Sequence, residues 1–444
     1  MVTNVTDKYL KMKIHILGIC GTFMGGLAQI LVEKGHIVSG SDKQFYSPMS
    51  DQLYSLGVEM IEGYEASNLP IADLYVIGNA LSRGNPSVEY VLNNKLEYTS
   101  GPKMLGDMIR DRTVIAVSGT HGKTSTSFLL CEIFQAQGID IGFLVGGVSN
   151  SFKHSARLGT SEFFIIEADE YDSAFFDKRS KFIHYQPDTF IINNIEFDHA
   201  DIFNELSDIL KQFHHAVRTV PENGNILFHE QDENILELLK MGYWSNIHPL
   251  GSLDNIQFSS EDNSINFENE KFDVSTLPMH GSHNIKNAVI AMYAAYLHGV
   301  PLTQSFAALQ NSKGVKRRFE TVFENDSKIV IDDFAHHPTA ISQTIKAAKN
   351  YYSSKKILAI IELGSNTMSE GHHGKKLYES AAELEKVFWL NVSGSKNVDF
   401  EYDSIELLLK DLTDNIDKYD VILIMSNKDS KKISEPVIEL IENK

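Results

Sequence analysis

The stretch that decides the fold is Thr113-Val-Ile-Ala-Val-Ser-Gly119-Thr-His-Gly-Lys123-Thr124-Ser125, in which a β-branched apolar run leads directly into a glycine loop. Residues 128–134 follow with large apolar side chains at helical spacing, so the stretch predicts a strand, a tight loop and a helix. In such a loop backbone N–H groups cradle phosphate oxygens, Lys123 neutralises their charge, and Thr124 offers a hydroxyl to Mg²⁺. Val117 stands where the strict phosphate-loop pattern has its first glycine, and a glycine turn with a surface lysine is the alternative interpretation.

Apolar β-branched runs of the same kind recur along the chain and alternate with stretches of helical period. We expect strands at residues 14–17, 74–77, 113–117, 163–166, 189–192, 328–331, 357–361 and 421–424. Helices are expected at 23–31, ending near Gly35, and at 285–296, ending near Gly299. Continuous apolar strands separated by amphipathic helices predict parallel sheets that are buried on both faces, so the fold class is α/β.

Three changes in composition suggest where domains meet. A Ser-Gly-Pro turn at 100–102 precedes the decisive strand, and a polar loop at 311–314 precedes a new strand–helix series. Residues 251–276 are polar and poor in helical period, which indicates an insertion or a β-edge. We therefore expect three segments, 1–108, 109–312 and 313–444, a number that suits a chain of 444 residues.

The charge and the cysteine content exclude several classes of protein. A net charge of −19 without a basic stripe argues against binding to nucleic acid or to an anionic membrane. No apolar run approaches the length that spans a bilayer, and the first residues show no secretory signal. With only Cys20 and Cys131, a disulfide framework is excluded and the reducing cytoplasm is the expected location.

A metal site is predicted next to the phosphate loop. Glu167 directly follows a buried-type strand, and a carboxylate at the carboxyl end of a parallel strand lies where ligands bind in open α/β sheets. Mg²⁺ prefers one or two carboxylates together with phosphate oxygens. One strand later His199 lies among Asn, Glu and Asp residues, so its imidazole could hold a second Mg²⁺. A solvated acidic loop and a structural histidine are the alternatives.

An earlier glycine cluster predicts a second nucleotide site. Gly18, Gly21 and Gly25 follow the first strand, where glycines let the backbone approach a pyrophosphate. Asp42 ends the second strand, where a carboxylate could accept hydrogen bonds from a nucleotide. The spacing only approximates the dinucleotide fingerprint, and close strand–helix packing is the alternative.

Polar residues further along the chain complete the candidate set. Asn284 and Asn287 lie about one helical turn apart, so both could face one edge of a base. Arg318 suits a phosphate or a carboxylate, and Asp333, after a strand, suits ribose hydroxyls. Taken singly, each could also be a cap, a surface cation or a turn residue.

Six motifs in this order resemble those of the Mur ligase family, the ATP-dependent amide-forming enzymes of bacterial cell-wall synthesis. They are Gly119-Thr-His-Gly-Lys-Thr124, Glu167-Ala-Asp-Glu170, Asn194-Ile-Glu-Phe-Asp-His199, His283-Asn-Ile-Lys-Asn287, Arg317-Arg-Phe319 and Asp332-Asp-Phe-Ala-His-His-Pro338. Residues 15–26, 78–86 and 171–182 resemble the murein peptide ligases of this family more than its UDP-N-acetylmuramate–L-alanine ligases.

The resemblance implies a three-domain fold: a Rossmann-like UDP-sugar domain, a central ATPase and a C-terminal Rossmann-like domain. It implies an ADP-forming ligase that joins the recycled tripeptide L-alanyl-γ-D-glutamyl-meso-diaminopimelate to UDP-N-acetylmuramate in peptidoglycan recycling. The lactyl carboxylate would attack the γ-phosphate of ATP, and the tripeptide amine would then attack the acyl phosphate. The expected cofactor is Mg²⁺, two ions per site. The expected assembly is a monomer or a weak homodimer.

The resemblance also implies roles for individual residues. The expected catalytic residues are Lys123, His199, Arg318 and His336. The expected ATP-binding residues are Gly119, Thr120, His121, Gly122, Lys123, Thr124, Ser125, Asn194, His283, Asn284, Asn287, Arg318 and Asp333. The expected UDP-sugar-binding residues are Gly18, Gly21, Gly25, Asp42, Asn79 and Ser82. The expected metal ligands are Thr124, Glu167 and His199.

Two departures from the family pattern lie in the C-terminal segment, which handles the incoming peptide. Leu363-Gly364 stands where a Pro-Arg pair is common, and residues 428–433 replace a glycine-rich loop. Three other functions therefore stay open: addition of free L-alanine, an NAD-dependent oxidoreductase based on the first glycine cluster, and a nucleotide-binding protein without ligase activity. Lys123 in its phosphate loop argues against the oxidoreductase.

Overall fold

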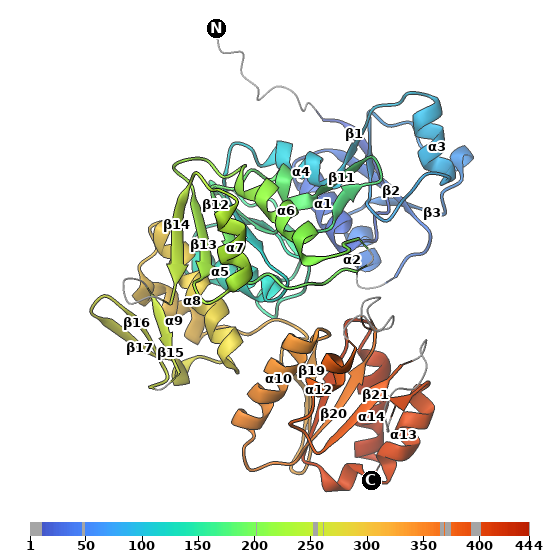
Figure 1. The fold of residues 1–444 in the computed structure, drawn as a ribbon. Coiled ribbons are helices and arrows are strands. Elements are labelled where there is room, and N and C mark those ends of the chain that lie inside the picture. The colour runs from blue at the N-terminus through green and yellow to red at the C-terminus, as the bar shows by residue number, and fades with distance from the viewer. Residues whose placement is uncertain are drawn as a thin grey trace.

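The computed structural model describes residues 11–46, 49–200, 202–251, 256–260, 262–364, 368, 374–391 and 401–443. Three α/β units follow one another along the chain, and the C-terminal unit forms a separate lobe (Figure 1). Each unit is built on one main sheet, of five, seven and six strands respectively. The expected α/β class is therefore confirmed, whereas the exact boundaries near residues 109 and 313 stay predictions.

The N-terminal sheet is parallel, with the strand order β3-β2-β1-β4-β5. Its strands are β1 Lys13–Leu17, β2 Ile37–Asp42, β3 Glu59–Glu62, β4 Leu74–Ile77 and β5 Tyr98–Ser100. Its helices are α1 Thr22–Glu33, α2 Met49–Ser55, α3 Pro86–Asn93 and α4 Gly101–Met108. Because β1 lies between β2 and β4, the strand order reverses there, and open α/β sheets bind ligands beyond the carboxyl ends of the strands at such a point.

The central sheet has the order β14-β13-β12-β6-β9-β7-β8, and only β8 runs antiparallel to its neighbour. Its strands are β6 Thr113–Ser118, β7 Gly142–Leu144, β8 Ala156–Arg157, β9 Phe163–Glu167, β12 Thr189–Ile192, β13 Asn225–His229 and β14 Asn246–Leu250. Its helices are α5 Lys123–Ala136, α6 Leu206–Val217, α7 Glu233–Lys240, α8 Ser282–Leu297 and α9 Leu302–Gln310. The segments after β12 and β9 therefore flank the loop that follows β6.

Alternating side chains of β6 explain why this strand is a continuous apolar run. Val114 and Ala116 belong to the core that contains α6 and α7, whereas Ile115 and Val117 belong to the core that contains α5, α8 and α9. Successive residues of a strand point to opposite faces, so a strand covered on both faces is apolar throughout.

Smaller elements decorate the central unit. A hairpin of β10 Asp172–Ala174 and β11 Asp177–Ser180 follows β9 and leads into the 3₁₀ helix η3 Lys181–His184. Strands β15 Gln257–Ser259, β16 Ser264–Phe267 and β17 Glu270–Asp273 form a separate antiparallel sheet. This sheet lies within the expected insertion at 251–276, of which residues 252–255 and 261 are outside the described residues.

The C-terminal sheet has the order β18-β19-β23-β20-β21-β22, with β18 antiparallel and the others parallel. Its strands are β18 Glu320–Glu324, β19 Ile329–Asp333, β20 Ile357–Glu362, β21 Lys386–Leu390, β22 Glu401–Tyr402 and β23 Val421–Met425. Its helices are α10 Pro338–Tyr351, α12 Lys375–Glu379, α13 Ile405–Thr413 and α14 Lys431–Glu442. Residues 365–367, next to the altered Leu363-Gly364 pair, are outside the described residues.

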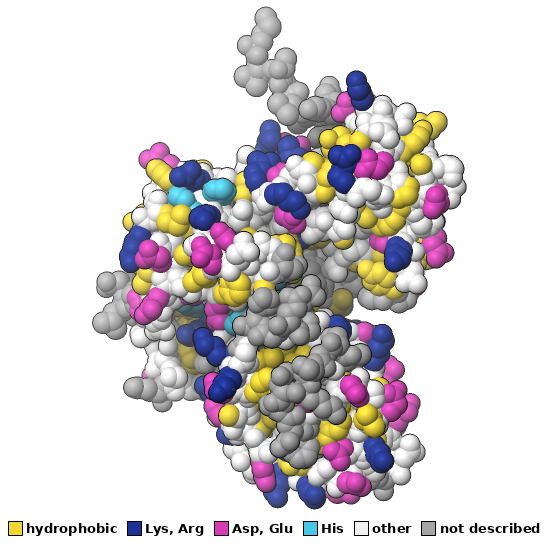
Figure 2. All heavy atoms as spheres, turned by 45° about the vertical axis from the view of Figure 1, so that its right-hand side comes forward, with side chains coloured by type: hydrophobic (Ala, Val, Ile, Leu, Met, Phe, Trp, Pro, Cys, Tyr) yellow, Lys and Arg dark blue, Asp and Glu magenta, His cyan; other side chains and the backbone are white. Residues whose placement is uncertain are grey.

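All eight strands expected from the sequence are present, within a few residues of the expected bounds. The two expected helices correspond to α1 and α8, and Gly35 and Gly299 follow them with positive φ angles. Within the described ranges no helix is both long and apolar enough to cross a membrane. Basic and acidic side chains are both spread over the face of the molecule that Figure 2 displays.

Candidate active site

The loop between β6 and α5 has the backbone conformation that its glycines permit. Gly119 and Gly122 have φ angles of +123° and +82°, which side chains rarely tolerate. A Cβ atom on Gly122 would lie 2.6 Å from Asn287 Oδ1 and 2.9 Å from Asn193 Nδ2. The loop can therefore lie directly against these two amides only because residue 122 has no side chain.

Asn194 braces the same loop from the end of β12. The His121 N–H donates to Asn194 Oδ1 at 2.8 Å, and Asn194 Nδ2 donates to the carbonyl of His121 at 3.1 Å. Next to it the hydroxyl of Thr120 accepts the Glu196 N–H at 2.8 Å. The amide of Asn194 thus binds the loop through both its oxygen and its nitrogen, and its expected contact with adenosine stays a prediction.

Lys123, the first residue of α5, points back across the loop into an acidic environment. Its Nζ donates to the carbonyl of Gly119 at 2.6 Å and to Glu170 Oε2 at 3.0 Å. Burial acts to lower the pKa of Lys123, but the carboxylates of Glu170, Asp169 and Glu167 outweigh it and hold that pKa above its usual value. The side chain is therefore a firmly charged ammonium at the mouth of the phosphate loop.

The predicted metal pair is brought together. The hydroxyl of Thr124 lies 3.1 Å from both carboxylate oxygens of Glu167, and the Gly146 N–H donates to Glu167 Oε2 at 2.8 Å. Burial raises the pKa of Glu167, and the charge of Lys123 partly offsets this effect. A hydroxyl and a carboxylate that meet beside a phosphate loop form a donor set that suits Mg²⁺.

His199 lies in a second group of donors, which the sequence only partly predicted. Its Nε2 is 2.9 Å from Glu170 Oε1, and ligand atoms of Asp169, Glu170 and His199 all lie within 4.8 Å of one another. Burial acts to lower the pKa of His199, but its hydrogen bond and charge interaction with Glu170 raise it overall. Oxygen donors with one imidazole can hold a divalent cation.

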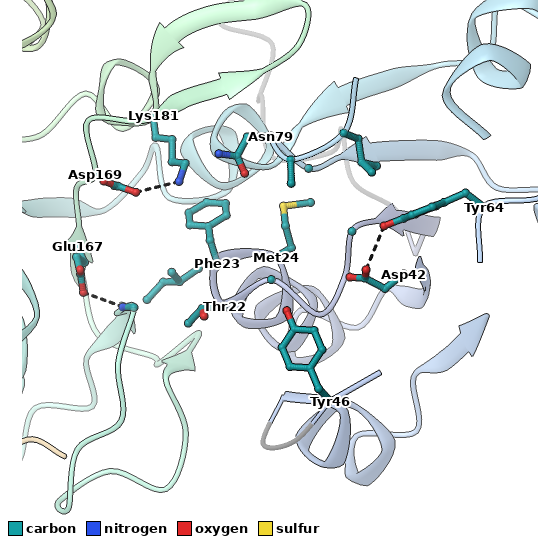
Figure 3. Close-up of a pocket in the computed structure, with 17 residues that line it drawn as sticks. Thr22, Phe23, Met24, Asp42, Tyr46, Tyr64, Asn79, Glu167, Asp169 and Lys181 are labelled. Carbon is teal, nitrogen blue, oxygen red and sulfur yellow. Dashed lines mark hydrogen bonds and ion pairs between the residues drawn. The ribbon is translucent and has the colours of Figure 1, made fainter. Parts of the chain in front are cut away.

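A cavity of about 410 Å³ connects this edge of the central sheet with the N-terminal sheet (Figure 3). Gly18, Gly21, Asp42 and Asn79 line it, as expected for a UDP-sugar site, and Glu167 lines its other end. Asp42 accepts the Cys20 N–H at 2.8 Å and the hydroxyl of Tyr64 at 3.1 Å. The volume and the mixture of apolar walls with few polar groups are typical of a ligand pocket.

Two predicted UDP-sugar residues lie away from this cavity. Gly25 is buried within α1, where a Cβ atom would lie 2.1 Å from the sulfur of Met49. Ser82 is exposed, and its hydroxyl is 3.5 Å from the carbonyl of Arg83. Neither lines the cavity: Gly25 permits close packing of α1 against Met49 of α2, and Ser82 lies on an outer loop. Their roles in UDP-sugar binding stay predictions.

A second cavity, of about 320 Å³, lies beside α5 and α8. Ser125, Asn284 and Arg318 line it, so the structure brings these three expected ATP-binding residues together. Asn287 does not line it and instead lies against Gly122. The structure therefore does not bring Asn284 and Asn287 together at one cavity, and their shared contact with a base stays a prediction.

Three further expected residues lie where α8 begins and where β19 of the C-terminal lobe ends. The carboxylate of Asp333 accepts the Phe319 and Ala335 N–H groups at 2.7 and 2.8 Å, and burial raises its pKa. His336 Nδ1 lies 2.9 Å from the carbonyl of Phe334. His283 lies at the start of α8, and burial lowers its pKa to about 4. Their roles with ATP stay predictions.

The central unit and the C-terminal lobe meet at Glu196. The hydroxyl of Thr339 donates to Glu196 Oε2 at 2.6 Å, and His337 Nδ1 lies 3.4 Å from the same oxygen. The rings of His121 and His337 have their centroids 4.7 Å apart. The phosphate loop is therefore in direct contact with the start of α10.

Sequence reasoning missed several residues that the structure places here. Glu170 belongs to the acidic motif Glu167–Glu170, but its contact with Lys123 depends on the path of the chain after β9. Lys181 belongs to a stretch marked in the sequence only by a family resemblance, and it lines the cavity together with Tyr46 and Tyr64. No local pattern marks these tyrosines, because they come from loops whose position depends on the order of the strands.

Comparison with known proteins adds three family models and several close relatives. The models described as the Mur ligase family catalytic domain, the Mur ligase middle domain and the Mur ligase glutamate ligase domain match residues 13–113, 117–295 and 317–428. The chain is 47% identical over 386 residues to a UDP-N-acetylmuramate–L-alanyl-γ-D-glutamyl-meso-2,6-diaminoheptandioate ligase of Haemophilus influenzae, covering 85% of each protein. The ligase of the same name from Escherichia coli is 46% identical over 387 residues, again covering 85% of each protein. The crystal structure of a murein peptide ligase from Psychrobacter arcticus superimposes with a TM-score of 0.75 at 39% identity, over 98% of this chain and 99% of that one.

Proposed function

The chain belongs to the Mur ligase family, and from this premise we propose that it joins a murein tripeptide to UDP-N-acetylmuramate at the expense of ATP. The relatives at 46–47% identity carry this activity in their names. The enzyme is thus an ADP-forming amide ligase of peptidoglycan synthesis. The tripeptide is L-alanyl-γ-D-glutamyl-meso-diaminopimelate.

One observation carries the proposal: the cavity that begins at Gly18 and Asp42 ends at Glu167, which is in contact with Thr124 of the phosphate loop. A UDP-sugar bound by the N-terminal sheet would extend its acid toward the γ-phosphate of ATP in that loop. In-line phosphoryl transfer requires positioning and charge neutralisation more than covalent help. Glu167 at the end of the first cavity is thus one hydrogen bond away from the phosphate loop, where such a transfer would take place.

We infer the following sequence of bond changes. A carboxylate oxygen of the sugar-borne lactyl group forms a bond to the γ-phosphorus while the bond to ADP breaks, which gives an acyl phosphate. The tripeptide amine then adds to the carbonyl carbon, phosphate leaves, and the amine proton passes to solvent. Glu170 keeps Lys123 charged as an ammonium. This ammonium neutralises negative charge on the phosphates of ATP while the γ-phosphoryl group is transferred.

We propose two Mg²⁺ sites beside the loop. Thr124 and Glu167 would hold one ion, and His199 with Asp169 and Glu170 would hold the other. Bound Mg²⁺ would neutralise phosphate oxygens and orient them. The donor sets fit, since they consist of a hydroxyl, carboxylates and one imidazole.

The second cavity is our candidate for the adenosine half of ATP. It adjoins Ser125 at the start of α5 and contains Asn284 and Arg318. The guanidinium carbon of Arg318 lies 4.9 Å from the centre of the Phe334 ring, which holds it against the C-terminal lobe.

We further propose that the chain works in the cytoplasm as a monomer or a weak homodimer. Cys20 and Cys131 are both buried free thiols, which suits a reducing compartment.

An acceptor panel tests the function. The purified chain is incubated with ATP, Mg²⁺ and UDP-N-acetylmuramate, with the tripeptide, with L-alanine or with no acceptor, and phosphate release and product mass are measured. We expect release and a UDP-N-acetylmuramoyl tripeptide only with the tripeptide. Product with L-alanine would instead indicate the sister ligase activity, and release that is independent of acceptor would indicate an ATPase without ligation.

A further inference from the structure

The cavity between the N-terminal and central units contains three carboxylates and one cation. Asp42, Glu167 and Asp169 line it, and Lys181 is the single basic side chain among the described residues that do so. Figure 3 shows Lys181, Asp169 and Glu167 on one wall, with Asp42 and Tyr64 at the opposite end. An anionic group that enters this cavity is repelled by most of its charged walls and attracted at one point.

Lys181 is held so that its ammonium stays at that point. Only 11% of its side chain is exposed, and Nζ donates to Asp169 Oδ2 at 3.0 Å. The ammonium also lies 5.8 Å from the centre of the Phe23 ring and 5.5 Å from that of Tyr171. Phe23 comes from the N-terminal unit and Tyr171 from the central unit, so the lysine bridges the two.

The backbone of Lys181 is equally fixed. Its N–H donates to the carbonyl of Tyr171 at 2.9 Å, and it is the first residue of η3, directly after β11. An ammonium has three N–H donors, and Asp169 accepts from it in the part of the chain that the structure describes. Donor capacity therefore remains for a ligand that arrives from the cavity.

We propose that Lys181 binds the lactyl carboxylate of the UDP-sugar substrate and places it beside Glu167 and the phosphate loop. The inference rests on the proposed function, which supplies a substrate with a diphosphate at one end and a reacting carboxylate at the other. The glycine loop and Asp42 occupy the end of the cavity that suits the nucleotide, whereas Lys181 lies on the wall shared with the predicted metal ligand. A lysine there offsets the repulsion that Asp169 and Glu167 exert on the incoming carboxylate.

The experiment compares two ligands that differ in this carboxylate. UDP-N-acetylmuramate carries the lactyl group, whereas UDP-N-acetylglucosamine has the same nucleotide and diphosphate without it. Calorimetry without ATP or acceptor gives Kd for both ligands with the native chain and with Lys181→Met. We expect UDP-N-acetylmuramate to bind about 10- to 100-fold more weakly to the variant, the usual effect of losing a hydrogen bond to a charged group. UDP-N-acetylglucosamine should change by less than about threefold.

A matched control comes from the same hairpin. Lys178 lies on β11 with 71% of its side chain exposed and pairs with Asp172, so Lys178→Met removes the same charge from the same segment outside the cavity. We expect it to leave both Kd values unchanged. Lys181→Arg, which keeps the positive charge, should recover part of the lost affinity for UDP-N-acetylmuramate. If Lys181→Met does not fold, Lys181→Gln, whose amide can still donate to Asp169, allows the same comparison.

Equal weakening of both ligands would overturn the proposal, because Lys181 would then bind the diphosphate or support the fold. Unchanged binding of both would overturn it as well. These outcomes are independent of the acceptor panel, since neither ATP nor the tripeptide is present. The ligase activity can therefore stand while this inference fails, and the inference can stand while the acceptor proves to be different.

Discussion

Replacing Gly122 by alanine tests the phosphate loop directly. The φ angle of +82° costs a non-glycine residue about 1 kcal/mol. The new Cβ would approach Asn287 Oδ1 to 2.6 Å and Asn193 Nδ2 to 2.9 Å, so both amides must move. Asn193 then gives up its hydrogen bond to the buried hydroxyl of Thr126, now 3.0 Å long, at about 1–1.5 kcal/mol, and displacement of Asn287 adds a similar amount.

These contributions add up to about 3 kcal/mol against the present loop conformation, which is about 100-fold in an equilibrium constant. We expect Gly122→Ala to weaken binding of a non-hydrolysable ATP analogue with Mg²⁺ by about that factor in calorimetry. Binding of UDP-N-acetylmuramate should stay within about threefold, because this ligand occupies the other cavity. Urea unfolding of the same samples shows whether the variant is folded.

Gly138 provides the control for the backbone effect alone. It follows the other end of α5 with a φ angle of +74°, and a Cβ atom there would meet nothing within 4 Å. Gly138→Ala should therefore lower the free energy of unfolding by about 1 kcal/mol and leave the affinity for the ATP analogue unchanged. The reasoning is refuted if folded Gly122→Ala binds the analogue normally, or if both alanine variants weaken its binding equally.

Three further outcomes follow from the geometry. Lys123→Ala should abolish phosphate release and leave the Kd for UDP-N-acetylmuramate within about threefold, since the two nucleotides use different units; equal loss of both in calorimetry would contradict this division. Thr124→Val, which removes the hydroxyl 3.1 Å from Glu167, should raise the Mg²⁺ concentration for half-maximal turnover about tenfold, and an unchanged Mg²⁺ dependence would show that Thr124 is not a ligand. His15 is fully buried in β1, and burial lowers its pKa to about 4, so between pH 6.5 and pH 4 the unfolded chain binds a proton that the folded chain does not. His15 should therefore account for about 3 kcal/mol of the stability that the native chain loses as pH falls through that window. His15→Gln should lose correspondingly less in urea titrations at pH 7 and pH 4; identical losses would rule out a contribution from His15.

The sequence predicts the strands of the three sheets well because burial on both faces leaves a strong apolar signal. Strands without such burial leave a weaker signal in the sequence. The separate hairpin β10–β11 is polar along most of its length, and the edge strand β22 has only two residues, Glu401 and Tyr402. Such strands are specified by their partners in the sheet, and a single sequence does not show those partners.

Some residues of the candidate site could likewise be predicted from the sequence, and others could not. The phosphate loop and Glu167 could be predicted because strand, loop and carboxylate follow one another in the chain. Glu170, Lys181 and the contact between Asn287 and Gly122 could not, because they depend on which strand lies beside which. Gly25 shows the opposite difficulty, since a glycine required for helix packing looks the same in a sequence as one required for a ligand.

The contacts of Glu196 join two parts of the enzyme thermodynamically. Its N–H donates to Thr120 of the phosphate loop, and its carboxylate accepts from Thr339 at the start of α10. Suppose that a nucleotide in the loop makes docking of the lobe through Thr339 more or less favourable by a given factor. Docking of the lobe must then change the affinity for that nucleotide by the same factor. Such reciprocity would let an acceptor held by the C-terminal lobe alter how strongly ATP is retained.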